Sequence, residues 1–84
     1  MVYYVYMLKC ISEKITKTYV GYTNNLTLRL RKHNSGKGAK STRGLKCEII
    51  YKKKFSLKSE AMSYEYKLKK DKFKRGILLQ NSNE

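Results

Sequence analysis

The sequence predicts an α/β fold of the α+β class: a three-stranded antiparallel sheet flanked by about three helices, in the order β-β-α-β-α-α. Three runs rich in β-branched and aromatic residues, at 2–10, 18–22 and 47–55, predict the strands. Two further segments, at about 25–34 and from 59 onward, place apolar residues at helical spacing. This arrangement favours helices packed on one small sheet.

A chain of 84 residues is long enough for one hydrophobic core and no more. It contains no proline, and its sequence shows no internal repeat. We therefore expect a single domain over residues 1–84, with its core at about 2–70 and a polar tail at about 80–84.

The run at 2–10 is apolar on both of its alternating faces, which is typical of a central strand. The strand at 18–22 returns antiparallel and places Tyr19 and Gly21 on the same face. A glycine inside a strand indicates the close approach of another backbone or of a ligand.

Side chains that can cap a helix occupy positions 23–25 and open the first helix, which Gly36 ends. The segment 34–46 is rich in Gly, Ser and Lys, and it predicts a mobile loop. A second helix opens at Ser59, and a short third helix is expected at about 72–79. The apolar strip of the second helix consists of Ala61, Met62, Tyr64 and Leu68.

Twenty lysines and arginines against six acidic residues give the chain a formal net charge of +14. Such a protein repels copies of itself and attracts polyanions, most readily a phosphate backbone. We expect a monomer, with a weak dimer as the alternative, and DNA as the partner, with RNA left open. The cations expected to bind the backbone are Arg31, Lys32, Lys37, Lys40 and Arg43.

Cys10 and Cys47 each lie inside a strand-like run, where a free thiol behaves as a small apolar side chain. The cysteines and the one histidine are too few and too scattered for structural zinc, and we expect neither a zinc finger nor a disulfide scaffold. No run approaches the roughly 18 to 20 apolar residues that span a bilayer, and the N-terminus does not resemble a signal peptide. We expect a cytoplasmic protein, associated with the nucleoid if the source is bacterial.

Arg29 and His33 occupy unexpected places on the leucine-bearing first helix. Positions four apart share a helix face, so the two side chains present one composite surface. Arginine offers phosphate oxygens a planar fork of donors, and histidine exchanges a proton near neutral pH. Taken alone, such a pair more often lies at the edge of a helix and extends into water.

Glu65 lies on the apolar strip of the second helix. A carboxylate there either pairs with a cation, for which Arg29 is a candidate, or faces a cleft where it holds a hard divalent metal. The six acidic residues are spread along the chain, so metal chemistry would use one ion held largely by water and substrate phosphate.

The eight tyrosines are the third unusual feature, and they cluster near the N-terminus. Tyr3 and Tyr22 are expected to be sheet core. Tyr6 and Tyr19 are expected to lie side by side with their hydroxyls toward one cleft. A phenol near a metal and an arginine can have its pKa lowered enough to act as a general base.

Together these residues resemble the GIY-YIG nuclease superfamily, and in particular its small single-domain group of uncharacterised bacterial proteins. The matching elements are Tyr4, Val5 and Tyr6; Tyr19, Val20 and Gly21; Arg29; His33; and the segment SEAMSYEYKLKK that contains Glu65. The segment HNSGKGAKSTRG at 33–44 is similar to one found in the same group. Tyr4 stands where the first motif often has glycine, and Asn81 lies too near the end to replace an asparagine that many active members carry.

The resemblance implies a metal-dependent DNA endonuclease whose nicking is directed by structure rather than sequence, in DNA repair or recombination. Arg29 would stabilise the pentavalent phosphate, and Glu65 would hold one Mg²⁺ or Mn²⁺. Tyr6 and Tyr19 would position or activate the attacking water, and His33 would assist proton transfer. A protein partner would supply specificity.

Two other functions remain compatible with the same residues. One is a non-catalytic nucleic-acid-binding module that has the same fold, because a fold does not determine an activity. The other is an adaptor that lends its basic surface to a protein partner.

Overall fold

The computed structural model describes residues 1–82 and confirms the expected order of elements. In chain order they are β1 (Tyr3–Ile11), β2 (Thr16–Thr23), α1 (Leu26–Asn34), the 3₁₀ turn η1 (Lys40–Thr42), β3 (Lys46–Phe55), α2 (Lys58–Lys70) and α3 (Lys72–Asn81). The strands form one antiparallel sheet in the order β2-β1-β3, so the first strand is central, as its apolar pattern predicts.

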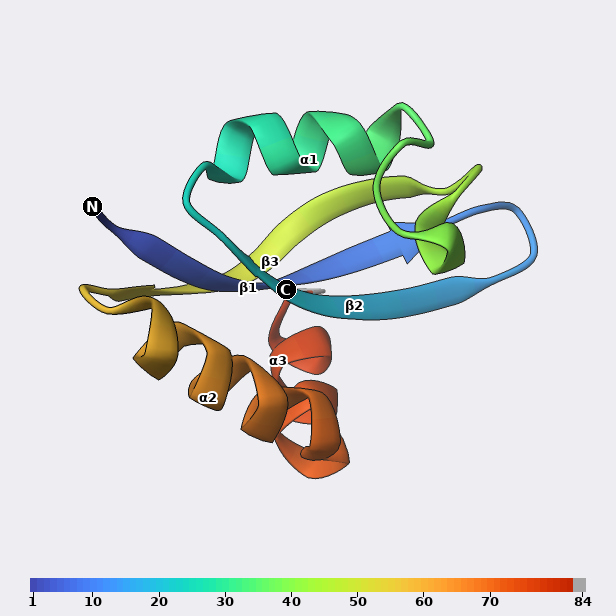
Figure 1. Cartoon of the computed structure of the whole chain (residues 1–84). Coiled ribbons are helices and arrows are strands. Elements are labelled where there is room, and N and C mark those ends of the chain that lie inside the picture. Colours follow the sequence, from blue (N-terminus) through green and yellow to red (C-terminus); the bar gives the residue numbers. More distant parts are fainter. Residues whose placement is uncertain (83–84) are drawn as a thin grey trace.

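The sheet is the middle of three layers, with α1 on one face and α2 and α3 on the other (Figure 1). The alternation along β1 divides the core accordingly, because successive side chains point to opposite faces. The core on the α2 side consists of Val5, Met7, Val20, Ala61 and Leu68. The core on the α1 side consists of Tyr6, Leu8, Cys10, Leu45 and Cys47.

Helix α1 begins where its capping side chain predicts. The side chain of Asn25 accepts a hydrogen bond from the Leu28 amide at 3.1 Å, which satisfies one of the free amides of the first turn. After Ser35, Gly36 adopts a φ of +80°, a conformation that side chains other than glycine rarely take. The chain therefore leaves the helix at the predicted position.

The C-terminal helices differ from expectation in two details. Ala61 and Leu68 of α2 are buried, but Met62 is 46% exposed because it lies about 100° round the helix from Ala61. Helix α3 runs to Asn81, two residues beyond its predicted end. The predicted polar tail at 80–84 therefore overlaps this helix. Residues 83–84 of that predicted tail lie outside the described residues.

The prediction of two free thiols is wrong, because Cys10 and Cys47 form a disulfide. The two residues face each other in the register of β1 and β3, with their Cα atoms 4.0 Å apart. The sequence places each cysteine in a strand, but the pairing depends on a register that becomes visible only in the folded sheet.

The segment 34–46 is predicted to be a mobile loop, but its part at 35–45, between α1 and β3, packs against His33 of α1. It contains η1, and Thr42 and Leu45 are both buried. Among the described residues, no helix has the length and apolar character needed to cross a bilayer.

Candidate active site

A pocket of about 200 Å³ opens at strand β2, on the edge of the sheet. Its walls come from β2, α1 and α2: Tyr19, Val20, Gly21, Tyr22, Arg29, Glu65 and Lys69. Because neighbouring residues of a strand point to opposite faces, β2 contributes residues to the pocket on both faces of the sheet. Arg29 approaches from the α1 side and Glu65 from the α2 side, so the pocket straddles the sheet edge.

Tyr6 lies behind this pocket and is only 1% exposed. Its hydroxyl oxygen accepts a hydrogen bond from Nε of Arg29 at 3.2 Å. A Cβ on Gly21 would lie 2.6 Å from the same oxygen, so the phenol occupies the space that a side chain would take. The glycine in β2 thus serves a close approach, but the approaching group is the Tyr6 phenol and not the backbone or ligand that the sequence predicts.

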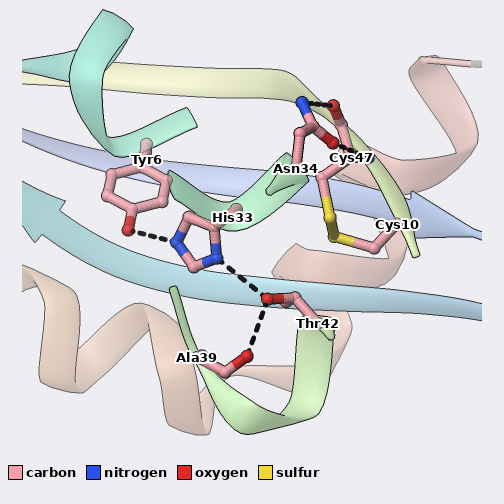
Figure 2. Close-up of a disulfide and its surroundings, with 7 residues drawn as sticks. All are labelled: Tyr6, Cys10, His33, Asn34, Ala39, Thr42 and Cys47. Atoms are coloured by element: carbon pink, nitrogen blue, oxygen red, sulfur yellow. Dashed lines mark hydrogen bonds between the residues drawn. A yellow bond between two sulfur atoms is a disulfide. The ribbon is translucent and has the colours of Figure 1, made fainter. Parts of the chain in front are cut away.

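His33 is fully buried, so it does not extend into water at the helix edge, where such residues are more often found. Its Nε2 atom lies 3.1 Å from the Tyr6 hydroxyl, and its Nδ1 atom lies 3.0 Å from Oγ1 of Thr42 (Figure 2). The Tyr19 ring covers the imidazole, with 4.7 Å between ring centroids. His33 therefore reaches the pocket through the two tyrosines.

Burial dominates the electrostatics of this cluster. It raises the pKa of Tyr6 above its usual value, although the hydrogen bond and charge of Arg29 act in the opposite direction. The net shift is therefore opposite to the one expected from Arg29 alone. Burial and the nearby Arg29 charge lower the pKa of His33, so the imidazole is neutral at pH 7. The hydrogen bond that Arg29 donates to the Tyr6 hydroxyl raises the pKa of Arg29, which stays cationic.

Glu65 pairs with Lys69 of its own helix, with Nζ and Oε1 3.0 Å apart. Of the two cations that share the pocket with this carboxylate, Lys69 is therefore the one in direct contact, where the sequence suggested Arg29. The Glu65 side chain is 16% exposed, so its carboxylate stays accessible from the pocket. Within residues 1–82, no three His, Cys, Asp or Glu side chains gather as a metal-binding group.

The end of α1 is held in place by contacts that the sequence did not indicate. The Asn34 side chain accepts a hydrogen bond from the Cys47 amide at 2.7 Å and donates one to the Cys47 carbonyl at 3.1 Å (Figure 2). This pair of bonds joins the helix to β3 beside the disulfide. Thr42 and Gly38 contact His33 from the loop side. Only the similarity of the 33–44 segment to a family motif pointed toward this region.

The structure thus brings the five predicted catalytic side chains together near the β2 edge of the sheet. Tyr6, Arg29 and His33 form one hydrogen-bonded group, and Tyr19 packs on it. Glu65 joins them through the shared pocket. Of the remaining motif residues, Val20 and Gly21 line the pocket, Val5 lies in the core, and Tyr4 is half-buried on β1.

The predicted nucleic-acid-binding cations are all exposed. Two lie in the last turn of α1 and three in the segment that follows it: Arg31, Lys32, Lys37, Lys40 and Arg43. Helix α1 therefore contributes both to the pocket, through Arg29, and to this set of cations, through Arg31 and Lys32.

Comparison with known proteins identifies a family. The model of the family described as the GIY-YIG catalytic domain matches residues 2–77. A UPF0213 protein of Oceanobacillus iheyensis is 53% identical over 68 residues, which is 80% of this chain and 76% of the relative. A UPF0213 protein of Bacillus subtilis is 45% identical over 69 residues, which is 81% of this chain and 67% of the relative.

A solved structure is similar over nearly the whole chain. The solution NMR structure of a UPF0213 protein from Bacillus halodurans is 39% identical in sequence, with a TM-score of 0.54. The match covers 96% of this chain and 84% of that one.

Proposed function

Because the chain belongs to the GIY-YIG family, whose catalytic domain it matches over residues 2–77, we propose that it is a metal-dependent DNA endonuclease. The observation that carries the proposal is the meeting of Arg29, Tyr19 and Glu65 in one pocket, with Tyr6 and His33 directly behind it. This set combines a cation for phosphate, a chain of proton-exchanging groups and a carboxylate. Each of the three can contribute to phosphodiester hydrolysis.

Arg29 is proposed to bind the scissile phosphate. Its Nε donates a hydrogen bond to the Tyr6 hydroxyl, and a hydrogen bond to Tyr19 also holds the guanidinium at the pocket that Arg29 lines. A fixed, permanently charged fork stabilises the charge that develops on the phosphate oxygens, and it needs no reorientation during the reaction.

The attacking water is proposed to lose its proton through Tyr6 to His33. Tyr19 positions the water in the pocket, and the Tyr6 oxygen, at the wall formed by Gly21, accepts the water proton. The phenol proton passes at the same time to Nε2 of His33. The hydroxide attacks phosphorus, the bond to the leaving oxygen breaks, and that oxygen takes a proton from solvent. Neutral His33 is suited to this role because its lowered pKa leaves a ring nitrogen free to accept.

Glu65 is proposed to hold one Mg²⁺ or Mn²⁺. A single accessible carboxylate fits such an ion, which commonly retains water and binds substrate phosphate alongside one or two protein carboxylates. When bound, the ion would neutralise charge on the phosphate and the leaving oxygen.

DNA is proposed to lie across the exposed cations of α1 and the segment after it. Lysine and arginine side chains at a helix end and in a loop bind phosphates, which fix position without reading bases. We therefore propose nicking that depends on the structure of the substrate, in repair or recombination, with further specificity from a protein partner in the cytoplasm. If these five cations each neutralise one phosphate, the log–log salt slope of binding will be about −4 to −5.

The test is cleavage of supercoiled, flap and branched DNA by purified protein with Mg²⁺ or Mn²⁺. The variants Arg29→Ala and Glu65→Ala should each lose at least about 100-fold in kcat, because each removes charge stabilisation from the transition state. Matched controls are Lys67→Ala and Glu60→Ala, which remove a cation and a carboxylate at exposed positions of α2.

Three results would count against the proposal. Cleavage that survives both active-site substitutions indicates a contaminating nuclease. Binding with the expected salt slope but no cleavage of any substrate identifies a non-catalytic module with the same fold. A salt slope near zero removes the assigned backbone contacts.

A further inference from the structure

The segment 35–45 packs under the ring of His33. Thr42 is 2% exposed, and its Oγ1 lies 3.0 Å from Nδ1 of the imidazole. Gly38 contacts the same ring from the loop, where an added Cβ would lie 2.6 Å from Nδ1 and 2.9 Å from the His33 Cα. A loop with no space for even a methyl group against the histidine holds that ring in one place.

A count of protons gives the direction of the hydrogen bond between Thr42 and His33. A threonine hydroxyl has one proton to donate, and Oγ1 lies 3.0 Å from the Ala39 carbonyl oxygen, which can only accept (Figure 2). With that proton directed to Ala39, Oγ1 can only accept from Nδ1. His33 must then carry its proton on Nδ1, and its Nε2 presents a lone pair to the Tyr6 hydroxyl.

We propose that Thr42 is a positioning residue that selects the Nδ1–H tautomer of His33, and thereby makes Nε2 the acceptor of the Tyr6 proton. The inference rests on the proposed nuclease function and adds to it a residue outside the pocket. The order of donors runs from Arg29 Nε to Tyr6, from Tyr6 to His33, and from His33 to Thr42. Thr42 in turn donates to the Ala39 carbonyl, which is the last acceptor of the chain of hydrogen bonds.

The opposite tautomer would block proton transfer. With the proton on Nε2, the imidazole would donate to Tyr6 and could not accept a proton from it. Thr42 would then have to donate to Nδ1, and the Ala39 carbonyl would lose the hydroxyl as a partner. The Tyr6 hydroxyl proton would lose its acceptor at a site that is 1% exposed, where solvent does not replace a missing partner. The Ala39 carbonyl would keep the Thr42 amide, at 3.2 Å, as its donor.

The test reads the tautomer directly by nitrogen-15 NMR of the whole chain. His33 is the only histidine in the sequence, so its ring signals are unambiguous. The wild-type protein should show a protonated Nδ1 and an unprotonated Nε2 at pH 7 and above. Thr42→Val keeps the shape of the side chain without the hydroxyl, and should shift the ring toward the Nε2–H tautomer or a mixture.

Cleavage assays supply the functional half of the test. Thr42→Val should lower kcat by about 10- to 100-fold with little change in KM, because a general base contributes about 10²–10⁴-fold in total. Thr42→Ser retains the hydroxyl and should restore both the wild-type tautomer and the wild-type kcat. A variant that altered only packing would not show this rescue together with the change of tautomer.

The possible outcomes separate the inference from the proposed function. An Nε2–H tautomer in the wild-type protein overturns the inference, whether or not Thr42→Val folds. So does a Thr42→Val protein that keeps both the Nδ1–H tautomer and full kcat. A wild-type chain that cuts no DNA but shows the Nδ1–H pattern, lost in Thr42→Val, overturns the proposed function and leaves the selection of the tautomer by Thr42 supported.

Discussion

The hydroxyl of Tyr6 lies 3.1 Å from Nε2 of His33, and neither side chain is more than 1% exposed. Solvent cannot replace either partner, so each depends on the other for its hydrogen bond. The same hydroxyl holds Nε of Arg29. A single phenol oxygen therefore joins the group proposed to bind phosphate to the group proposed to accept a proton.

Replacing this phenol should affect activity far more than folding. Tyr6→Phe removes the oxygen and should lower kcat by about 10²–10⁴-fold, the usual contribution of a general acid or base. The unfolding free energy should fall by about 1–3 kcal/mol, because His33 and Arg29 each lose a partner. Cleavage rates and urea denaturation measure the two effects. Tyr66→Phe makes the same change at an exposed position and should leave both unchanged; equal losses in the two variants would refute the assignment.

Gly21→Ala should displace the Tyr6 phenol. The new Cβ would lie 2.6 Å from the hydroxyl oxygen and 3.0 Å from a ring carbon of Tyr19, so both tyrosines would have to move. We expect a loss of about 1–3 kcal/mol in unfolding free energy and a clear fall in kcat. Gly76→Ala is the control, because its Cβ would meet no atom within 4 Å and should stabilise α3 by up to about 1 kcal/mol. Unaltered cleavage by Gly21→Ala would show that the position of Tyr6 is unimportant.

Lys69 should compete with metal for Glu65. Lys69 is largely exposed, and such ion pairs contribute at most about 1 kcal/mol, so an added divalent ion can displace the ammonium group. Lys69→Met should therefore lower the Mg²⁺ concentration that gives half-maximal cleavage, by no more than about 5-fold. Titration of Mg²⁺ against cleavage rate measures this, with Lys67→Met as the control on the same helix. A higher Mg²⁺ requirement in Lys69→Met would mean that Lys69 supports the site.

Buried neutral His33 should make stability depend on pH. Its pKa is lowered from 6.5 in the folded chain, so between the two pKa values the unfolded state binds a proton that the folded state excludes. The unfolding free energy should be highest above about pH 6.5 and fall as the pH drops below it, by at most about 1.4 kcal/mol per unit. Urea denaturation from pH 5 to 7.5 measures the slope, which His33→Gln should abolish. A wild-type slope of opposite sign would mean that the folded protein favours charged His33.

Reduction of the disulfide should destabilise the domain. The bond between Cys10 and Cys47 spans 37 positions, for which the loss of unfolded-chain entropy corresponds to about 4 kcal/mol. Unfolding followed with and without a thiol reductant measures this difference. The double variant Cys10→Ser, Cys47→Ser should be insensitive to the reductant. An identical unfolding midpoint for the wild-type protein in both conditions would contradict the prediction.

The sequence predicts the elements well because their signals are local. Alternating side chains in 2–10 and 18–22 indicate which face each tyrosine joins, and Asn25 marks the start of α1. The signals for Arg29 and His33 are local too, since a spacing of four places them on one helix face. Local patterns of this kind are sufficient for the fold and for most of the pocket.

Other features depend on parts of the chain that meet only after folding. The disulfide follows from the register of β1 and β3, and the burial of His33 follows from the path of the segment 35–45. That segment has few apolar side chains, so its composition indicates a mobile loop, whereas its packing depends on Gly38 and on hydrogen bonds of Thr42. The partner of Glu65 was missed for a different reason: Lys69 is a local neighbour, but the carboxylate had several possible cations.

The pocket at the sheet edge has a mechanical consequence. Arg29 and Glu65 belong to helices that pack on opposite faces of the sheet (Figure 1). Each helix makes its main contacts with the strands between them. A substrate phosphate bound to Arg29, together with a metal ion bound to Glu65, would connect the two side chains across the edge strand β2. The occupied pocket would then link α1 directly to α2. Bound substrate would therefore reduce the motion of these two helices relative to each other.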